Sequence, residues 1–172
     1  MAVGRELGVG RRVGRGVKTL TLEKFSRAAR LILGAGAALL VFGEARASVR
    51  WATLEAIHQL ENPRDLTRPG PCGELGAYQF RATTWRMHTT LPFKRAIERR
   101  TSDSVAVRHY EWIKSGLERA GVPATPFFIG LAWNGGLDAA KRGRAPRAAH
   151  DYAERVANLA AVLDSPTAPP GH

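Results

Sequence analysis

The sequence predicts a mainly α-helical fold in a single domain. Along several segments, apolar residues recur at spacings of three or four, the period of a helix with one buried face. No segment shows the apolar–polar alternation of a β-strand, and no internal repeat is present. The chain has 172 residues, which suits one domain of ordinary size. We therefore expect about five or six helices over roughly 115 ordered residues.

Residues 1–47 have the order of parts found in a secretory signal peptide. Residues 1–30 are basic and Gly-rich, residues 31–43 are uncharged and mostly apolar, and Ala45-Arg46-Ala47 forms an Ala-x-Ala cleavage site before Ser48. The apolar run falls short of the about 20 residues that span a bilayer. We expect cleavage and export to the periplasm or the cell exterior, with an uncleaved anchor in the inner membrane as the alternative.

The net charge of +11 divides almost evenly, with +6 on residues 1–47 and +5 on residues 48–172. A basic leader of this kind can also be a nucleic-acid-binding arm. The apolar run directly after the basic residues argues against that interpretation, so we expect no nucleic-acid partner.

The first helix of the mature domain ends in a candidate catalytic acid. Apolar residues recur every three positions from Trp51 to Leu60, and Glu61 lies four residues beyond Ile57, on the same side. Pro63 disfavours helical geometry at the residue before it, so the helix should end there. Burial and the helix C-terminus both raise the pKa of such a carboxyl, as a proton donor requires. The alternative is a last-turn glutamate that rotates into solvent.

The loop after this helix is rich in turn residues and ends in groups that suit a sugar ligand. Pro69-Gly70-Pro71 and Gly73 predict fixed turns, and Gly76 permits close backbone approach. Tyr78 and Gln79 then supply a flat ring and an amide, side chains that suit sugar hydroxyls and N-acetyl groups.

Two further helices are predicted in the middle of the chain. Residues 93–100 form a short basic segment that reads as a helix, and Ser102 and Asp103 can cap the helix that follows. Within that helix an apolar stripe runs over residues 106–117, and Gly121 lies just past its end.

Residues 126–140 are the most apolar stretch of the mature chain and predict a buried central helix. Asn134 in this helix needs a partner, which is either a structural hydrogen bond to a neighbouring loop or a ligand in a cleft. A turn-rich linker over residues 141–147 precedes a last helix over residues 152–163. The hydroxyl of Tyr152 at its start would need a partner such as Glu61.

Taken together, these motifs resemble the lytic transglycosylase (SLT-like) branch of the lysozyme-like superfamily. A glutamate ends a helix, a Gly-x-x-Gln segment follows 15 to 18 residues on, an aromatic-Asn-x-Gly segment comes about 70 residues on, and a tyrosine opens the last helix. In this sequence the matching residues are Glu61; Gly76, Ala77, Tyr78 and Gln79; Trp133, Asn134 and Gly136; and Tyr152. The order and spacing of the four motifs are fairly specific, and they cover roughly residues 50–163.

The resemblance implies a lysozyme-like helical domain over residues 48–163 with a substrate groove, followed by a disordered tail over 164–172. The expected substrate is the glycan strand of peptidoglycan, with Glu61 as the catalytic acid and base. The substrate-binding residues it implies are Gly76, Tyr78, Gln79, Trp133, Asn134 and Tyr152. Glu74 is a further substrate-binding candidate from the loop, with a role in holding the loop as its alternative. The chain departs from the family pattern at two positions, with Asn62 in place of the usual serine and Trp133 in place of the usual tyrosine.

Two other outcomes stay open on the same motifs. A lysozyme-type hydrolase would need a second carboxylate, for which Asp65 and Glu74 are the candidates. A peptidoglycan-binding protein without turnover would keep the groove alone, and the departures at Asn62 and Trp133 are what favour it.

No cofactor or metal is predicted. Cys72 is the only cysteine, so no internal disulfide forms, and no activating His/Asp arrangement surrounds it in sequence. The five histidines lack metal-ligand spacing. His58 and Glu61 lie three residues apart but have no third ligand in a known pattern. We expect a monomer.

Overall fold

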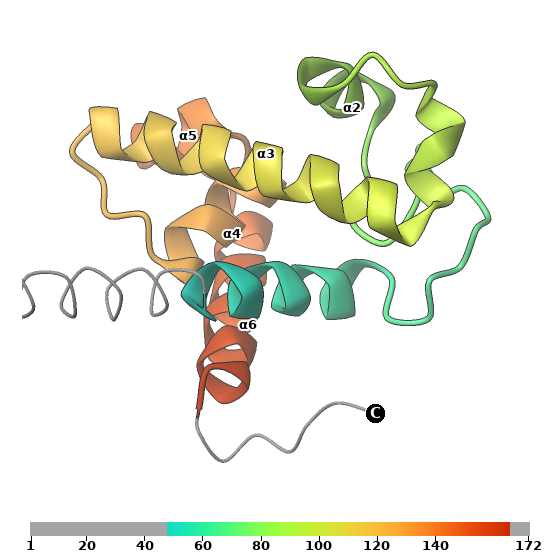
Figure 1. Cartoon of the computed structure of the whole chain (residues 1–172). Coiled ribbons are helices and arrows are strands. Elements are labelled where there is room, and N and C mark those ends of the chain that lie inside the picture. Colours follow the sequence, from blue (N-terminus) through green and yellow to red (C-terminus); the bar gives the residue numbers. More distant parts are fainter. Residues whose placement is uncertain (1–47, 166–172) are drawn as a thin grey trace, which may run out of the picture. The chain divides into compact units, whose positions relative to one another are not determined.

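The structure is a computed structural model that describes residues 48–165 (Figure 1). The predicted signal peptide and residues 166–172 of the predicted tail lie outside the described residues. Within 48–165 the fold is mainly α, as predicted, and the only extended pairing is a β-bridge between Leu75 and Phe80. None of the helices in this range is long and apolar enough to cross a membrane.

The helices follow one another with short connections after one long loop. A helix over residues 48–61, here called the Glu61 helix, leads into the loop over residues 62–81. After the loop come α2 (Ala82–His88), the 3₁₀ helix η1 (Phe93–Ile97), α3 (Arg99–Arg119), α4 (Pro126–Gly135), α5 (Leu137–Lys141) and α6 (Arg147–Leu163). The core-facing residues of these elements form one hydrophobic cluster.

The Glu61 helix and α3 lie side by side and run antiparallel (Figure 1). Arg50 Nη1 is 2.8 Å from Glu111 Oε1, and at the other end of the pair Arg99 Nη2 is 3.4 Å from Glu55 Oε2. The predicted apolar face is only partly right, because Trp51 is 56% exposed. The side of this helix that faces the core does not include Trp51. It includes Thr53, Ala56 and Ile57, which are fully buried.

The start of α3 differs from the prediction. The basic segment over 93–100 is not one helix, since η1 ends at Ile97 and Glu98 has an extended backbone before α3 begins at Arg99. Ser102 and Asp103 therefore lie inside α3 and do not cap it. Ser102 donates its N–H to the Glu98 carbonyl at 2.9 Å, which closes the first turn without a side-chain cap.

The remainder of α3 agrees with the sequence. The predicted stripe is buried along its length, at Ala106, Tyr110, Ile113 and Leu117. Gly121 follows the helix with a φ of +71°, in the left-handed region that glycine tolerates at a helix end.

The predicted central helix over 126–140 is two helices. The α4 helix ends at Gly135, and α5 starts at Leu137. Gly136 between them has φ +88° and ψ 144°, a conformation that no helix contains and that glycine adopts without strain. The last helix also starts earlier than predicted, at Arg147, directly after Pro146.

Helices α4 and α6 pack closely because small residues face each other across their contact. A Cβ on Gly130 would lie 3.0 Å from Cβ of Val156, and one on Gly135 would lie 2.9 Å from Cβ of Ala149. Glycine at both positions thus lets α6 approach α4 at short range. The close approach fixes where α6 presents Tyr152.

Candidate active site

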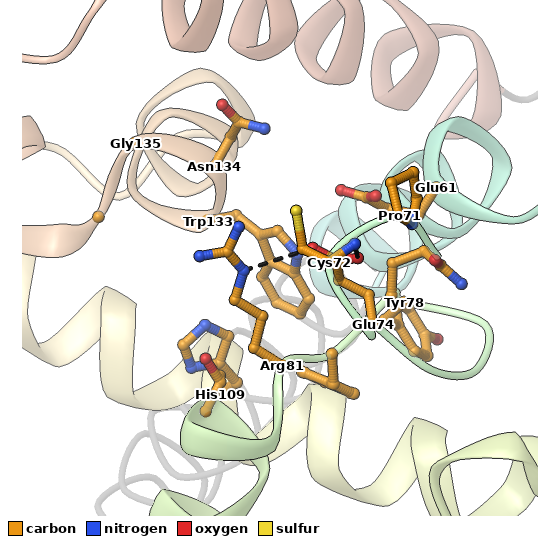
Figure 2. Close-up of a pocket in the computed structure, with 14 residues that line it drawn as sticks. Glu61, Pro71, Cys72, Glu74, Tyr78, Arg81, His109, Trp133, Asn134 and Gly135 are labelled. Carbon is orange, nitrogen blue, oxygen red and sulfur yellow. Dashed lines mark hydrogen bonds and ion pairs between the residues drawn. The ribbon is translucent and has the colours of Figure 1, made fainter. Parts of the chain in front are cut away.

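A cleft of about 670 Å³ opens between the Glu61 helix, the loop, α3 and α4 (Figure 2). Six of the predicted site residues line it, namely Glu61, Glu74, Tyr78, Gln79, Trp133 and Asn134. The other lining residues are Pro71, Cys72, Phe80, Arg81, Thr84, His109, Gly135 and Gly136. The predicted site residues Gly76 and Tyr152 do not line the cleft.

Glu61 is the last residue of its helix and stands between two hollows. A second hollow of about 480 Å³ lies on the other side of the loop and shares Glu61, Pro71 and Gln79 with the cleft. Glu61 therefore borders both hollows. This arrangement suits a polymer that extends on either side of the reacting bond.

The chemistry of Glu61 matches that of a proton donor. Burial raises the pKa of the Glu61 carboxyl, and the negative charge of Glu74 adds to the rise. The hydroxyl of Tyr152 donates to Glu61 Oε1 at 2.8 Å, which lowers the same pKa but leaves the net shift upward. Burial and the nearby Glu61 raise the pKa of Tyr152 far above neutrality, so its hydroxyl keeps its proton and donates. The alternative of a solvent-rotated Glu61 is wrong.

Glu74 shares the cleft with Glu61 but is held by other groups. Its Oε2 accepts the N–H of Cys72 at 2.9 Å, and its Oε1 is 3.4 Å from Nε of Arg81. Hydrogen bonds from the backbone N–H groups of Glu74 itself and of Cys72 lower the pKa of this carboxyl. Glu61 and Glu74 thus share one site with their pKa values moved in opposite directions.

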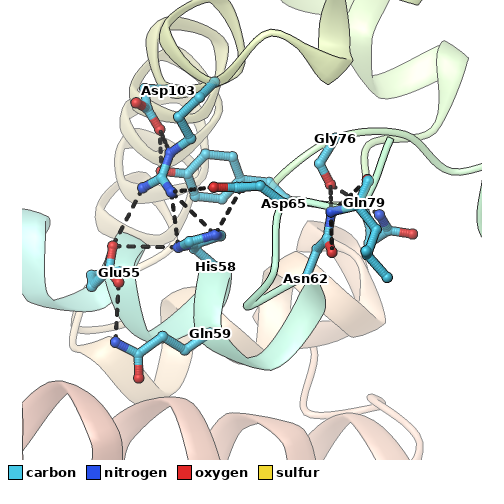
Figure 3. A network of polar contacts seen from close by, with 11 residues as sticks. Glu55, His58, Gln59, Asn62, Asp65, Gly76, Gln79 and Asp103 are labelled. Carbon is cyan, nitrogen blue, oxygen red and sulfur yellow. Dashed lines mark hydrogen bonds and ion pairs between the residues drawn. The ribbon is translucent and has the colours of Figure 1, made fainter. Parts of the chain in front are cut away.

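Asp65 does not line the cleft. It belongs to a polar network on the far side of the loop, shown in Figure 3, where its Oδ1 is 3.1 Å from Nε2 of His58. Arg99 reaches Asp65 Oδ2 at 3.3 Å and Asp103 Oδ1 at 2.8 Å, so it ties the loop to α3. Of the two carboxylates considered as a second acid, only Glu74 is therefore near Glu61.

Gly76 lies where the backbone of the loop packs closely against η1. Its φ is +80°, and a Cβ added there would lie 1.8 Å from the carbonyl oxygen of Ala96. The predicted close approach of the backbone at this glycine is therefore toward η1 and not toward the cleft. Its carbonyl oxygen accepts hydrogen bonds from the amides of Gln79, at 2.9 Å, and Asn62, at 3.2 Å.

Asn62 fastens the loop to the end of the Glu61 helix (Figure 3). Its side chain is buried and makes three hydrogen bonds, donating to the carbonyls of Leu66 and Gly76 and accepting from the N–H of Leu66. A residue at this place thus sets where the loop leaves the acid. The departure from serine has a structural reason in this chain.

The aromatic residues of the site form its floor. Tyr78 is 4% exposed, and its hydroxyl donates to Asp103 Oδ1 at 2.8 Å, so this hydroxyl is engaged within the protein. Trp133 packs against Tyr78, Phe80 and His109, with ring centroids 6.1, 5.7 and 4.7 Å apart. Trp133 is therefore held in place by three rings.

Asn134 is exposed and lies across the cleft from Glu61 in Figure 2. Within residues 48–165 its side chain makes no hydrogen bond to the protein, so the structural alternative of a bond to a neighbouring loop is wrong. Its amide is free to bind a ligand.

Arg81 and His109 are lining residues that the sequence analysis missed. Arg81 follows Gln79 by two residues, just outside the Gly-x-x-Gln segment, and this proximity is the one signal that could have indicated it. His109 is three residues after Ala106 on the buried stripe of α3, where a histidine is a polar exception. Burial and the neighbouring His88 lower the pKa of His109 to about 3, so His109 is a neutral imidazole near neutral pH.

Among the described residues, no group of three His, Cys, Asp or Glu side chains gathers in a way that could hold a metal ion. His58 is occupied by Asp65 and Arg99 and does not approach Glu61 as a shared ligand.

No protein-family model, curated protein or solved structure matches this chain.

Asn62→Ala is expected to destabilise the protein by about 2–3 kcal/mol, because it leaves the N–H and carbonyl of Leu66 without their side-chain partner and removes one of the hydrogen bonds to the Gly76 carbonyl. Chemical denaturation would measure the change in the free energy of unfolding. Asn134→Ala is the matched control, and its exposed amide predicts a stability within about 0.5 kcal/mol of the wild type. Equal stability of the two variants would show that Asn62 does not fasten the loop.

Proposed function

We propose that the protein is a lytic transglycosylase that cleaves the β-1,4 bond between N-acetylmuramic acid and N-acetylglucosamine in peptidoglycan. The observation that carries the proposal is Glu61, a carboxyl with a raised pKa, placed between two hollows and bonded to Tyr152. The arrangement of helices around it is proposed to be a lysozyme-like domain. The resemblance of the four motifs to that family supports the same substrate.

In the proposed mechanism, protonated Glu61 gives its proton to the glycosidic oxygen, which leaves as the 4-hydroxyl of N-acetylglucosamine. Glu61, now a carboxylate, removes the proton from the 6-hydroxyl of the muramoyl residue. The 6-oxygen then bonds to C1 of the same sugar and closes a 1,6-anhydro ring. Tyr152 holds the carboxyl group in both steps. The reaction needs no second carboxylate and consumes no water.

The occupied state of Glu74 favours this route over hydrolysis. A hydrolase needs a second carboxylate free to attack the sugar or to activate water. Both oxygens of Glu74 are engaged, one by the Cys72 N–H and one by Arg81. The lysozyme-type hydrolase is therefore the second candidate, with Glu74 as its only available partner for Glu61 among the described residues.

A binding protein without turnover has less support. The two departures from the family pattern were its basis, and each has a structural explanation in this chain. Asn62 fastens the loop, and Trp133 fills an aromatic floor. A site for binding alone has no need of a carboxyl with a raised pKa.

On the basis of the predicted signal peptide, we propose that this activity lies in the periplasm or outside the cell, with an inner-membrane anchor if the signal is retained. We propose a monomer that acts on glycan strands and needs no cofactor.

Mass spectrometry of purified peptidoglycan incubated with the chain from Ser48 onward tests the proposal. We expect anhydro-muropeptides from the wild type and none from Glu61→Gln. Products with reducing ends would instead identify a hydrolase. A folded wild type that releases no products would overturn the catalytic proposal and favour the binding protein.

Tyr152→Phe is expected to move the basic limb of the pH–rate profile to higher pH. The Tyr152 hydroxyl lowers the pKa of Glu61, so its removal raises that pKa further and keeps the acid protonated to a higher pH. The measurement is kcat/KM against pH. Tyr110→Phe is the control, since the Tyr110 hydroxyl makes no hydrogen bond to another described residue, and a basic limb moved equally in both variants would contradict the assignment.

A further inference from the structure

Arg81 is the one Lys or Arg among the described residues that line the cleft. It stands at the end of the loop, directly before α2, and its side chain is 66% exposed. Figure 2 shows it extending across the cleft from the side of Glu74 toward Trp133. Among the described lining residues, Arg81 thus supplies the one full positive charge, close to Glu74 and to the aromatic floor.

Glu74 positions this charge. The backbone holds Glu74 through the Cys72 N–H at its Oε2, and through the Gly70 N–H at its main-chain carbonyl, 2.8 Å away. The other carboxylate oxygen pairs with Nε of Arg81 at 3.4 Å. Because only 16% of the Glu74 side chain is exposed, a ligand entering the cleft meets the guanidinium rather than the carboxylate.

The two terminal nitrogens of Arg81 make no hydrogen bond within residues 48–165. A guanidinium carries five N–H donors in a planar fork, and the edge that the Nε pair leaves open can bind a carboxylate through two parallel hydrogen bonds. An exposed ion pair of this kind contributes little to stability, so the Arg81–Glu74 pair has little structural value of its own. The exposed amide of Asn134 suits sugar hydroxyls and N-acetyl groups, whereas the Gln79 amide nitrogen already donates to the Gly76 carbonyl.

We propose that Arg81 binds a carboxylate carried by the muramoyl residues of the substrate and so selects strands that contain them over neutral N-acetylglucosamine polymers. The inference rests on the proposed function and names the substrate feature that the cleft reads. Two sources of that carboxylate share the same chemistry. One is the lactyl carboxylate of a strand without peptides, and the other is a carboxylate of an attached peptide.

Binding measured separately from turnover tests the inference. In the full chain carrying Glu61→Gln, calorimetry would compare Arg81 with Arg81→Gln on three ligands: peptide-bearing strands, strands stripped of peptides by an amidase, and neutral N-acetylglucosamine oligomers. We expect Arg81→Gln to weaken binding of a carboxylate-bearing strand about tenfold and to leave the neutral oligomers within about twofold. Whether the loss falls on the stripped or on the peptide-bearing strand identifies the source of the carboxylate.

Arg86→Gln is the matched control for loss of one positive charge, because Arg86 lies on α2, exposed and outside the cleft. Arg81→Lys should retain part of the preference, since a lysine keeps the charge without the fork. The role of Arg81 would be overturned if Arg81→Gln weakened binding of neutral and charged ligands equally, or weakened binding of none of them. It would also be overturned if the protein bound none of the three ligands.

The activity of the protein with native Glu61 separates this inference from the proposed function. If the wild type cleaves strands and Arg81→Gln cleaves all of them equally well, the inference fails and the transglycosylase stands. If the wild type cleaves no strand, and Arg81→Gln still weakens binding of the carboxylate-bearing strands, the proposed function fails and the carboxylate site stands.

Discussion

Glu61→Gln is expected to lower the rate of strand cleavage by at least about 10²-fold, the lower end of what a positioned general acid contributes. Glutamine keeps an oxygen for the Tyr152 hydroxyl but has no proton to give. Because the proposed mechanism uses the same group as acid and base, both steps lose their catalyst. Release of anhydro-muropeptides under single-turnover conditions is the measurement, and a rate within about tenfold of the wild type would remove Glu61 from the mechanism.

Glu74→Gln is the matched control for this loss. A glutamine at this position still accepts from the Cys72 N–H but no longer carries the charge that pairs with Arg81. Under the transglycosylase mechanism its effect should fall mainly on KM. A loss in kcat as large as that of Glu61→Gln would point instead to a hydrolase with two catalytic carboxylates.

The same Glu61→Gln substitution should make the protein more stable at neutral pH. The pKa of Glu61 is raised in the folded state, so the folded state binds this proton more tightly than the unfolded chain does. That contribution to stability is fully present below the unfolded pKa and is lost as pH rises through the folded pKa. Glutamine does not titrate, so the melting temperature of the variant should exceed that of the wild type increasingly across this window and then level off.

Gly76→Ala is expected to cost roughly 3 kcal/mol or more of folding stability, which would unfold a protein of marginal stability. The new Cβ would lie 1.8 Å from the Ala96 carbonyl oxygen, and this neighbour is backbone that cannot rotate away. Separating the two would pull the loop from η1 and strain the two amide hydrogen bonds at the Gly76 carbonyl. Circular dichroism with urea denaturation would measure the loss.

Gly73→Ala separates the steric effect from the conformational one. Gly73 has the same φ of +80°, but a Cβ there meets nothing within 4 Å. Only the strain of the left-handed conformation remains, about 1–2 kcal/mol. If the two variants lose similar stability, the contact with Ala96 does not matter and Gly76 is required for its conformation alone.

The parts of the site that follow from local periodicity were predictable from the sequence. Glu61 lies four residues after the buried Ile57, so its position on the inner side of the helix is a matter of helical geometry. The need of Tyr152 for a partner follows from a hydroxyl on a buried helix face, and the structure confirms Glu61 as that partner.

The remainder depends on contacts between distant segments. The start of α3 lies three residues ahead of Ser102, where Arg99 is held by Asp65 and Glu55 from other parts of the chain. Ser102 and Asp103 are residue types that often cap a helix, which predicted a later start for α3. The long-range contacts of Arg99 outweigh this local preference. Asp65 and Glu74 looked equivalent in sequence, because only the folded loop shows that they face opposite sides.

The hydrogen bond between Glu61 and Tyr152 joins residues that are 91 positions apart. A ribosome delivers the chain from its N-terminus, so Glu61 emerges long before α6 exists. Until α6 has been made and has docked on α4 through Gly130 and Gly135, the acid has neither its hydroxyl partner nor its full burial. A nascent or truncated chain would therefore hold an ordinary surface glutamate, and the site would gain its proposed acid only as the last helix closes the domain.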